Sequence, residues 1–117
     1  MATDLTSIRT LLIDMDGVLY RGKTGLPGGP ELMAFLQERG IRFLMVTNNS
    51  TATQAEFVKR MAGFNIEVTE DEIITSGVAT AEYLTMIAPA GAKVNVVGEP
   101  ALSYEMEKRG FTLAGKD

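Results

Sequence analysis

The sequence predicts an α/β fold: a Rossmann-like parallel sheet with flanking helices, followed by the beginning of a second α/β domain. Short apolar runs typical of buried strands, beginning with Leu11–Ile13, alternate with segments of helical periodicity. Single helices between strands imply right-handed crossovers and therefore parallel pairing. Polar side chains follow two of these strands, which places them at the sheet edge where such folds bind ligands.

The first part of the chain gives two strands and one helix. Residues 9–13 are the first predicted strand, and a glycine-rich loop or flap is expected over residues 20–29. Pro30 can occupy the first turn of a helix, and Gly40 suits its carboxyl-terminal stop. The second strand is predicted over residues 41–46.

The next helix is marked by Thr53 and Glu56, which have the spacing of a capping box, and Gly63 can end it. Beyond it the sequence predicts, in order, a strand at 73–74, a helix over 76–87 that Ser76 caps, a strand over 93–97, a helix over 100–109 and an extended segment over 111–113. The stretch Ala88-Pro89-Ala90-Gly91 interrupts this pattern, so we place a domain boundary between residues 1–88 and 89–117.

The composition excludes several kinds of chemistry. The 117 residues include no Cys and no His, so thiolate metal sites and the commonest general base are absent. The net charge is −4 and no basic run is present, which gives nucleic-acid binding no support. The first residues do not resemble a signal peptide, and no apolar segment approaches transmembrane length. We therefore expect a cytoplasmic protein that binds neither nucleic acid nor membrane.

Two polar motifs carry the functional prediction. Asp14 and Asp16 follow the first strand, and Gly17 comes directly after them. Two carboxylates this close repel each other unless a cation or a proton neutralises them. The segment Thr47-Asn48-Asn49-Ser50 follows the second strand, and both motifs should therefore emerge at one edge of the parallel sheet.

Neither motif is specific when it is taken alone. Asp14-Met15-Asp16-Gly17 also suits a simple turn, although an EF-hand loop is disfavoured because a strand precedes it and later ligand positions do not fit. Polar residues after a strand are often only loop residues. A phospho-acceptor receiver domain is a further alternative, but its acceptor Asp would follow the third strand, where this chain has Thr75.

The two motifs together fit phosphoryl transfer. A carboxylate can attack phosphorus and form an aspartyl-phosphate, while a second acid protonates the leaving oxygen and later activates water. Hydroxyl and amide groups such as those of Thr47 and Asn49 can donate to phosphate oxygens. Mg²⁺ would offset the repulsion between the phosphate and the carboxylates.

On these residues the chain resembles the haloacid dehalogenase superfamily, and within it the branch of NagD and the 4-nitrophenylphosphatases. The matching segments are Asp14-Met15-Asp16-Gly17-Val18-Leu19 and Thr47-Asn48-Asn49-Ser50, with further similarity at residues 26–28, 74–76 and 96–99. The resemblance implies a magnesium-dependent phosphohydrolase of a small phosphorylated metabolite. It makes Asp14 the nucleophile and a metal ligand, and Asp16 the acid–base residue, which would bind the metal through its backbone carbonyl. Thr47, Asn48 and Asn49 would hold the phosphoryl group.

The chain also departs from the family pattern. The family's third motif is a Lys and its fourth supplies further metal-binding acids, and both follow a cap domain that begins here at about residue 89. Lys59 is expected to be a solvated helix side chain, and Gly115-Lys116-Asp117 a polar terminus. The alternative function is therefore a catalytically incompetent fragment or scaffold with the same fold. The family's arrangement would also leave the first strand as an exposed apolar edge, so we expect self-association through it.

Overall fold

The computed structural model describes residues 4–115. Its elements, in chain order, are β1 (Thr10–Asp14), β2 (Tyr20–Arg21), β3 (Thr24–Gly25), α1 (Gly29–Arg39), β4 (Arg42–Thr47), α2 (Gln54–Ala62), the 3₁₀ turn η1 (Glu70–Glu72), β5 (Ile73–Thr75), α3 (Ser76–Ile87), β6 (Lys93–Val94), α4 (Pro100–Lys108) and β7 (Thr112–Leu113). The Lys116 and Asp117 of the expected polar terminus, and the first three residues of the chain, lie outside the described residues.

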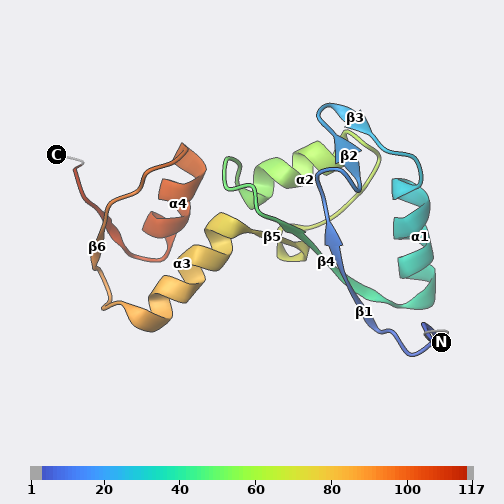
Figure 1. Cartoon of the computed structure of the whole chain (residues 1–117), viewed down its shortest axis with the longest axis horizontal. Coiled ribbons are helices and arrows are strands. Elements are labelled where there is room, and N and C mark those ends of the chain that lie inside the picture. The colour runs from blue at the N-terminus through green and yellow to red at the C-terminus, as the bar shows by residue number, and fades with distance from the viewer. Residues whose placement is uncertain (1–3, 116–117) are drawn as a thin grey trace.

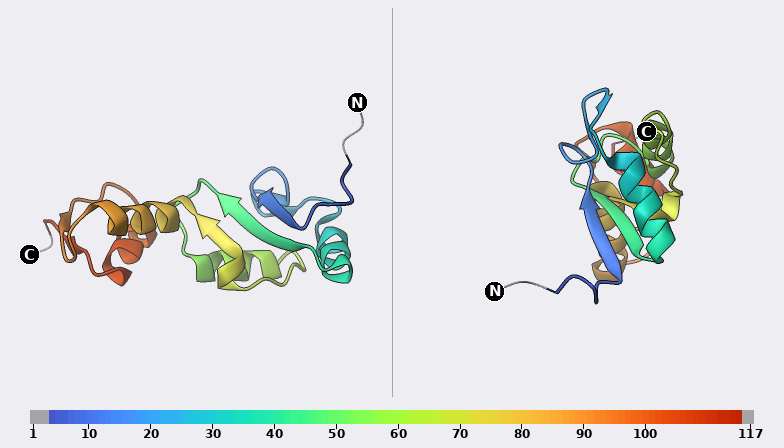
Figure 2. Two further views of the ribbon diagram at one scale, coloured as in Figure 1. Left: turned by 90° about the horizontal axis from the view of Figure 1, so that it is seen from below. Right: turned by 90° about the vertical axis from the view of Figure 1, so that its right-hand side faces the viewer.

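The main sheet is parallel, with strand order β1-β4-β5 (Figure 1). Helix α1 connects β1 to β4, and α2 connects β4 to β5. Both helices lie on one face of the sheet, as the two views of Figure 2 show. The predicted Rossmann-like parallel sheet with flanking helices is confirmed.

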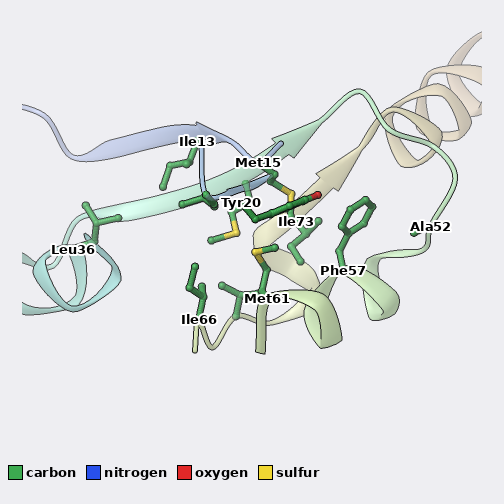
Figure 3. Close-up of a cluster of buried hydrophobic side chains, with 12 residues drawn as sticks. Ile13, Met15, Tyr20, Leu36, Ala52, Phe57, Met61, Ile66 and Ile73 are labelled. Carbon is green, nitrogen blue, oxygen red and sulfur yellow. The ribbon is translucent and has the colours of Figure 1, made fainter. Parts of the chain in front are cut away.

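The core lies between this sheet face and the two helices (Figure 3). The strands contribute one buried side chain each from the same face of the pleat, and the helices contribute leucine, phenylalanine and methionine. These residues are Ile13, Met45 and Ile73 from the sheet, Leu36 from α1, and Phe57 and Met61 from α2. Because strand side chains alternate, Leu12 points to the opposite face, where it is 71% exposed.

A second apolar cluster lies beyond the first, between α3, α4 and the small parallel pair β6–β7 (Figure 1). Its buried members are Ala81, Met106 and Phe111. Since Ala81 belongs to α3, this helix contributes to the second cluster while its first residue follows β5 directly. The domain boundary between residues 88 and 89 stays a prediction.

Three local details differ from the sequence prediction. The expected irregular flap contains a two-stranded hairpin, in which Tyr20 pairs with Gly25. The strand expected over 93–97 is limited to Lys93–Val94, because only these residues pair with β7. Thr75, one residue before the expected Ser76, caps α3 by accepting the Val78 N–H at 3.0 Å. Among residues 4–115, none of the helices is long and apolar enough to cross a membrane.

Candidate active site

The ends of β1 and β4 bring the two predicted motifs to one edge of the sheet. Asp14, the last residue of β1, pairs with Val46 of β4, and Thr47, the next residue after Val46, is the last residue of β4. Asp14 and Thr47 therefore lie at the ends of two adjacent parallel strands. Thr47 is in turn paired with Thr75 at the end of β5. The expectation that both motifs share the carboxyl edge is therefore met, whereas their chemical roles stay predictions.

The turn after β1 explains the spacing of the two acids. Met15 is fully buried, while Asp14 and Asp16 on either side of it are exposed. The Met15 carbonyl accepts the Leu19 N–H at 2.8 Å, and the Gly17 N–H donates to the Tyr20 carbonyl at 2.7 Å. Gly17 has φ +84°, a conformation that other residues adopt at a cost. Because the side chain of Met15 is buried, the carboxylates of Asp14 and Asp16 on either side of it lie at the surface of the site.

One carboxylate oxygen of Asp14 already accepts a hydrogen bond. Its Oδ1 accepts the Met15 backbone N–H at 2.8 Å. No donor among the described residues reaches its second oxygen. A carboxylate that is oriented by one hydrogen bond and free on its other oxygen is suited to attack an electrophile or to bind a cation.

The Thr47 hydroxyl is similarly oriented. The side chain is 4% exposed, and its Oγ1 accepts the Asn49 backbone N–H at 3.1 Å. A hydroxyl has one proton to donate, and here that proton has no acceptor among the described residues. The group therefore has a donor available for an incoming anion.

The loop after β4 is fixed from two sides. The Asn49 Oδ1 accepts the Thr51 N–H at 2.8 Å and the Thr51 hydroxyl at 2.5 Å, which leaves the Asn49 amide NH₂ to donate. The Asn48 carbonyl accepts the Ser76 hydroxyl at 2.9 Å, which ties this loop to the start of α3. Asn48 itself is exposed.

A cleft of about 530 Å³ adjoins these residues, between the β2–β3 hairpin and the last turn of α2. Asp16 and Asn49 from the two motifs line it together with Lys23, Lys59 and Arg60. A larger hollow of about 720 Å³ lies around the beginning of β4, at the opposite end of the strand, and includes no residue of either motif.

The sequence analysis did not assign these three basic residues to the site. Lys59 is exposed, as expected for a solvated helix side chain, yet it lines the same cleft as Asp16. Its position in the last turn of α2 is common for a cation, since the helix dipole favours positive charge there. Only the tertiary packing of the hairpin against α2 reveals the cleft.

The residues present fit a partial Mg²⁺ site. Mg²⁺ is usually bound by one or two carboxylates, waters and substrate phosphate oxygens, and the Asp14 carboxylate and the Asp16 backbone carbonyl would provide two oxygen ligands at one strand end. Residues 4–115 contain no group of three His, Cys, Asp or Glu that could hold a metal ion. The donor set thus suits a cation that a bound phosphate helps to retain.

Comparison with known proteins agrees with this geometry. A family model described as haloacid dehalogenase-like hydrolase matches residues 11–112. Phosphoglycolate phosphatase 1A of Arabidopsis thaliana is 37% identical over 112 residues, which are 95% of this chain and 31% of the relative. The chain therefore spans about a third of that relative.

Solved structures agree as well, and the chain covers less than half of each. A hypothetical protein of Pyrococcus horikoshii matches with TM-score 0.85 and 40% identity, over 91% of this chain and 40% of that one. The 4-nitrophenylphosphatase of Thermotoga maritima matches with TM-score 0.84 and 29% identity, over 94% of this chain and 42% of that one. NagD of E. coli matches with TM-score 0.83 and 32% identity, over 94% of this chain and 43% of that one. The resemblance to the NagD and 4-nitrophenylphosphatase branch is confirmed, and the chain belongs to the haloacid dehalogenase-like hydrolase family.

Proposed function

We propose that this chain provides the nucleophile and the phosphate-binding loop of a magnesium-dependent phosphohydrolase that acts on a small phosphate monoester. The observation that carries the proposal is the pair at the adjacent ends of β1 and β4. One free Asp14 oxygen and one available Thr47 hydroxyl proton lie at the same sheet edge. Relatives named as a phosphoglycolate phosphatase, a 5'-nucleotidase and an acid sugar phosphatase support a small phosphorylated substrate.

The chemistry follows from the residues. The free oxygen of Asp14 attacks phosphorus and forms an aspartyl-phosphate, while the ester P–O bond breaks and the Asp16 carboxyl gives its proton to the leaving oxygen. The Asp16 carboxylate then takes a proton from water, whose oxygen attacks the same phosphorus. The bond between phosphorus and Asp14 breaks, inorganic phosphate leaves, and both acids return to their starting states.

The phosphoryl oxygens would be held by donors from the loop after β4. Thr47 offers its hydroxyl proton and Asn49 its side-chain NH₂, with Asn48 beside them. The Asp14 carboxylate and the Asp16 backbone carbonyl would hold Mg²⁺, which when bound reduces the repulsion between phosphate and carboxylates. Donors already oriented by the protein need little reorganisation when charge develops on the phosphoryl group.

An alternative is a scaffold that binds phosphate esters without turnover. It is favoured by the lack, among residues 4–115, of a third acid within reach of Asp14 and Asp16. We expect the isolated chain to hydrolyse 4-nitrophenyl phosphate very slowly or not at all. Losing one oriented donor in comparable sites lowers turnover by about 10²- to 10³-fold. Robust magnesium-dependent hydrolysis would contradict this expectation.

The proposal is tested with Asp14→Asn, which keeps the shape of the side chain and removes its charge. Any magnesium-dependent hydrolysis by the chain should disappear in this variant. In NMR titrations of the unaltered chain, a phosphate ester with Mg²⁺ should shift the amide signals of Asp14–Gly17 and Thr47–Asn49, and Asp14→Asn should weaken this response. Turnover that survives in Asp14→Asn, after removal of contaminating phosphatase, would place the activity elsewhere.

A receiver domain is distinguished by treatment with an acyl-phosphate donor followed by mass spectrometry. A receiver retains the phosphoryl group on one Asp, whereas a phosphohydrolase site with a working Asp16 releases it. Stable labelling in the unaltered chain and in an Asp16→Asn variant alike would favour the receiver. Labelling that persists only in Asp16→Asn would support the proposed roles.

A further inference from the structure

The cleft beside the site is unusually basic for this chain. Three cationic residues line it, Lys23, Lys59 and Arg60, and Asp16 is the one carboxylate among its lining residues. The whole chain, by contrast, has a net charge of −4. The cleft is therefore a local positive region that begins at two residues of the phosphoryl-transfer site, Asp16 and Asn49.

The walls of the cleft are held together by aromatic contacts. Tyr20 of β2 is buried and stacks on Phe64, just beyond α2, with ring centroids 5.2 Å apart. A Cβ atom on Gly25 of β3 would come within 3.1 Å of the Phe64 ring, so glycine allows the hairpin to approach this closely. The hairpin that carries Lys23 is thus packed against the helix end that carries Lys59 and Arg60.

Arg60 is fixed rather than freely solvated. Its guanidinium carbon lies 4.8 Å from the Phe57 ring centroid and 5.9 Å from that of Tyr20, and its Nη1 donates to the Tyr20 hydroxyl at 3.4 Å. A guanidinium held over aromatic rings keeps most of its N–H groups available for an anion. It is therefore a preorganised positive group in the wall of the cleft.

Within the described part of the chain none of the three cations forms a salt bridge, although the Glu56 carboxylate on α2 interacts electrostatically with Arg60 and Lys59. Both salt bridges among residues 4–115 are made by Arg109, in the second cluster. The dipole of α2 explains a preference for cations at Lys59 and Arg60, but Lys23 lies on another element and gains nothing from that dipole. Convergence of cations that form no salt bridge among residues 4–115, from two elements beside a phosphate-binding loop, indicates a ligand with negative charge.

We infer that this cleft binds a second anionic group, a carboxylate or a phosphate, on the substrate whose phosphoryl group Asp14 attacks. The inference rests on the proposed function and narrows its substrate class to phosphate monoesters whose leaving alcohol carries that second anion. Lys23 and Lys59 act as specificity-determining residues, and Arg60 presents its remaining N–H groups to the same anion. A cleft of about 530 Å³ has room for a group of this size.

Binding of non-hydrolysable phosphonates to the full chain in the presence of Mg²⁺ tests this inference. Propylphosphonate has one anionic group, 3-phosphonopropionate adds a carboxylate, and propane bisphosphonate adds a second phosphonate. We expect at least one of the two doubly anionic probes to bind about tenfold more tightly than propylphosphonate, the effect of one charge-assisted hydrogen bond. Which of the two gains more identifies the second anion.

Variants locate the effect. In the double variant Lys23→Gln/Lys59→Gln the advantage of the doubly anionic probes should disappear, and both positions are exposed, so the fold should be retained. Lys93→Gln removes the same charge from an exposed position in β6, outside the cleft, and should leave the advantage intact. Raising the ionic strength should reduce the advantage in the unaltered chain and in Lys93→Gln.

The outcomes separate the two proposals. If propylphosphonate binds and Thr47→Ala weakens it, the phosphoryl site stands, and equal affinities of all three probes would overturn only the second-anion cleft. An advantage that survives in the double variant would also overturn it. If no probe binds, the proposed function fails and this inference fails with it.

Discussion

At the scale of single residues, the site depends on which atoms are already hydrogen-bonded and which are not. The Thr47 hydroxyl accepts the Asn49 N–H and keeps its own proton. Thr47→Val retains the shape but leaves that N–H without its partner in a partly buried position, which should lower the free energy of unfolding by roughly 1 to 3 kcal/mol. Urea unfolding measures this.

Thr47→Ser is the matched control, because it keeps the hydroxyl and removes only one methyl group. It should cost about 0.5 to 1.5 kcal/mol, the usual cost of deleting one buried methyl group, and should retain phosphonate binding. If the Thr47→Val variant is as stable as the Thr47→Ser variant or more stable, and its phosphonate binding is unchanged, the hydroxyl neither orients the loop nor binds the anion.

The sequence allowed prediction of the acids and of the loop after β4, because position at a strand end is a local property. Asp14 and Thr47 lie where the alternation of strands and helices placed them. Lys59 and Lys23 could not be placed in the same way. They are 36 positions apart in the sequence, and only the packing of Tyr20 and Gly25 against Phe64 brings their elements to one cleft.

At the scale of elements, capping chemistry was predictable and strand length was not. The capping box of α2 is present as expected: Thr53 Oγ1 accepts the Glu56 N–H at 3.2 Å, and Glu56 Oε1 accepts the Thr53 N–H at 3.1 Å. The sequence predicted a strand over residues 93–97, and Val96 and Val97 continue its apolar pattern after Val94. They are not paired, because strand length depends on the partner β7, which is itself two residues long.

The capping box makes part of the stability of α2 dependent on pH. The hydrogen bond from the Thr53 backbone N–H, together with the Thr53 side chain, lowers the pKa of Glu56 below its ordinary value. A carboxyl with a lower pKa in the folded state stabilises the fold above its unfolded pKa. That contribution is lost as the pH falls through the folded pKa.

NMR titration of the Glu56 carboxyl carbon should give a lower midpoint in the folded chain than in the chain unfolded in urea. Glu56→Gln keeps an acceptor for the Thr53 N–H but cannot ionise, so its stability should change less between neutral and acidic pH than that of the unaltered chain. Equal midpoints in the folded and unfolded states would contradict the hydrogen-bonded box.

Thr53→Ala removes the cap itself. It should lower the free energy of unfolding by about 1 kcal/mol, the usual value of a threonine or serine cap. Ala55→Ser, a change at an exposed position within the same helix, serves as the control and should have a smaller effect. Chemical denaturation of both variants at neutral pH gives the comparison.

At the scale of the whole molecule, the chain is elongated, with extents of 53 × 31 × 24 Å, and α3 joins its two apolar clusters (Figure 1). The family resemblance predicted that the first strand would lack a neighbour on one side. Among the described residues β1 pairs with β4 alone. The chain could have covered this edge with its own residues 93–97, but Lys93–Val94 pair with β7 in a separate sheet.

We propose that isolated copies of this chain self-associate through β1. An unpaired strand edge templates pairing with another chain, and here the exposed Leu12 adds apolar surface beside the unpaired backbone groups. Light scattering over a concentration series should therefore show mass rising above that of one chain.

Leu12→Lys tests the location of the contact. A charge on an edge strand opposes pairing, and because Leu12 is 71% exposed the substitution should leave the fold intact. Met86→Lys is the matched control, since Met86 is 79% exposed on α3 and far along the chain from β1. The lysine at position 12 should keep the chain monomeric, and the lysine at position 86 should not. Equal association of both variants would place the contact on another surface, and a strictly monomeric unaltered chain would mean that the open edge of β1 is tolerated in water.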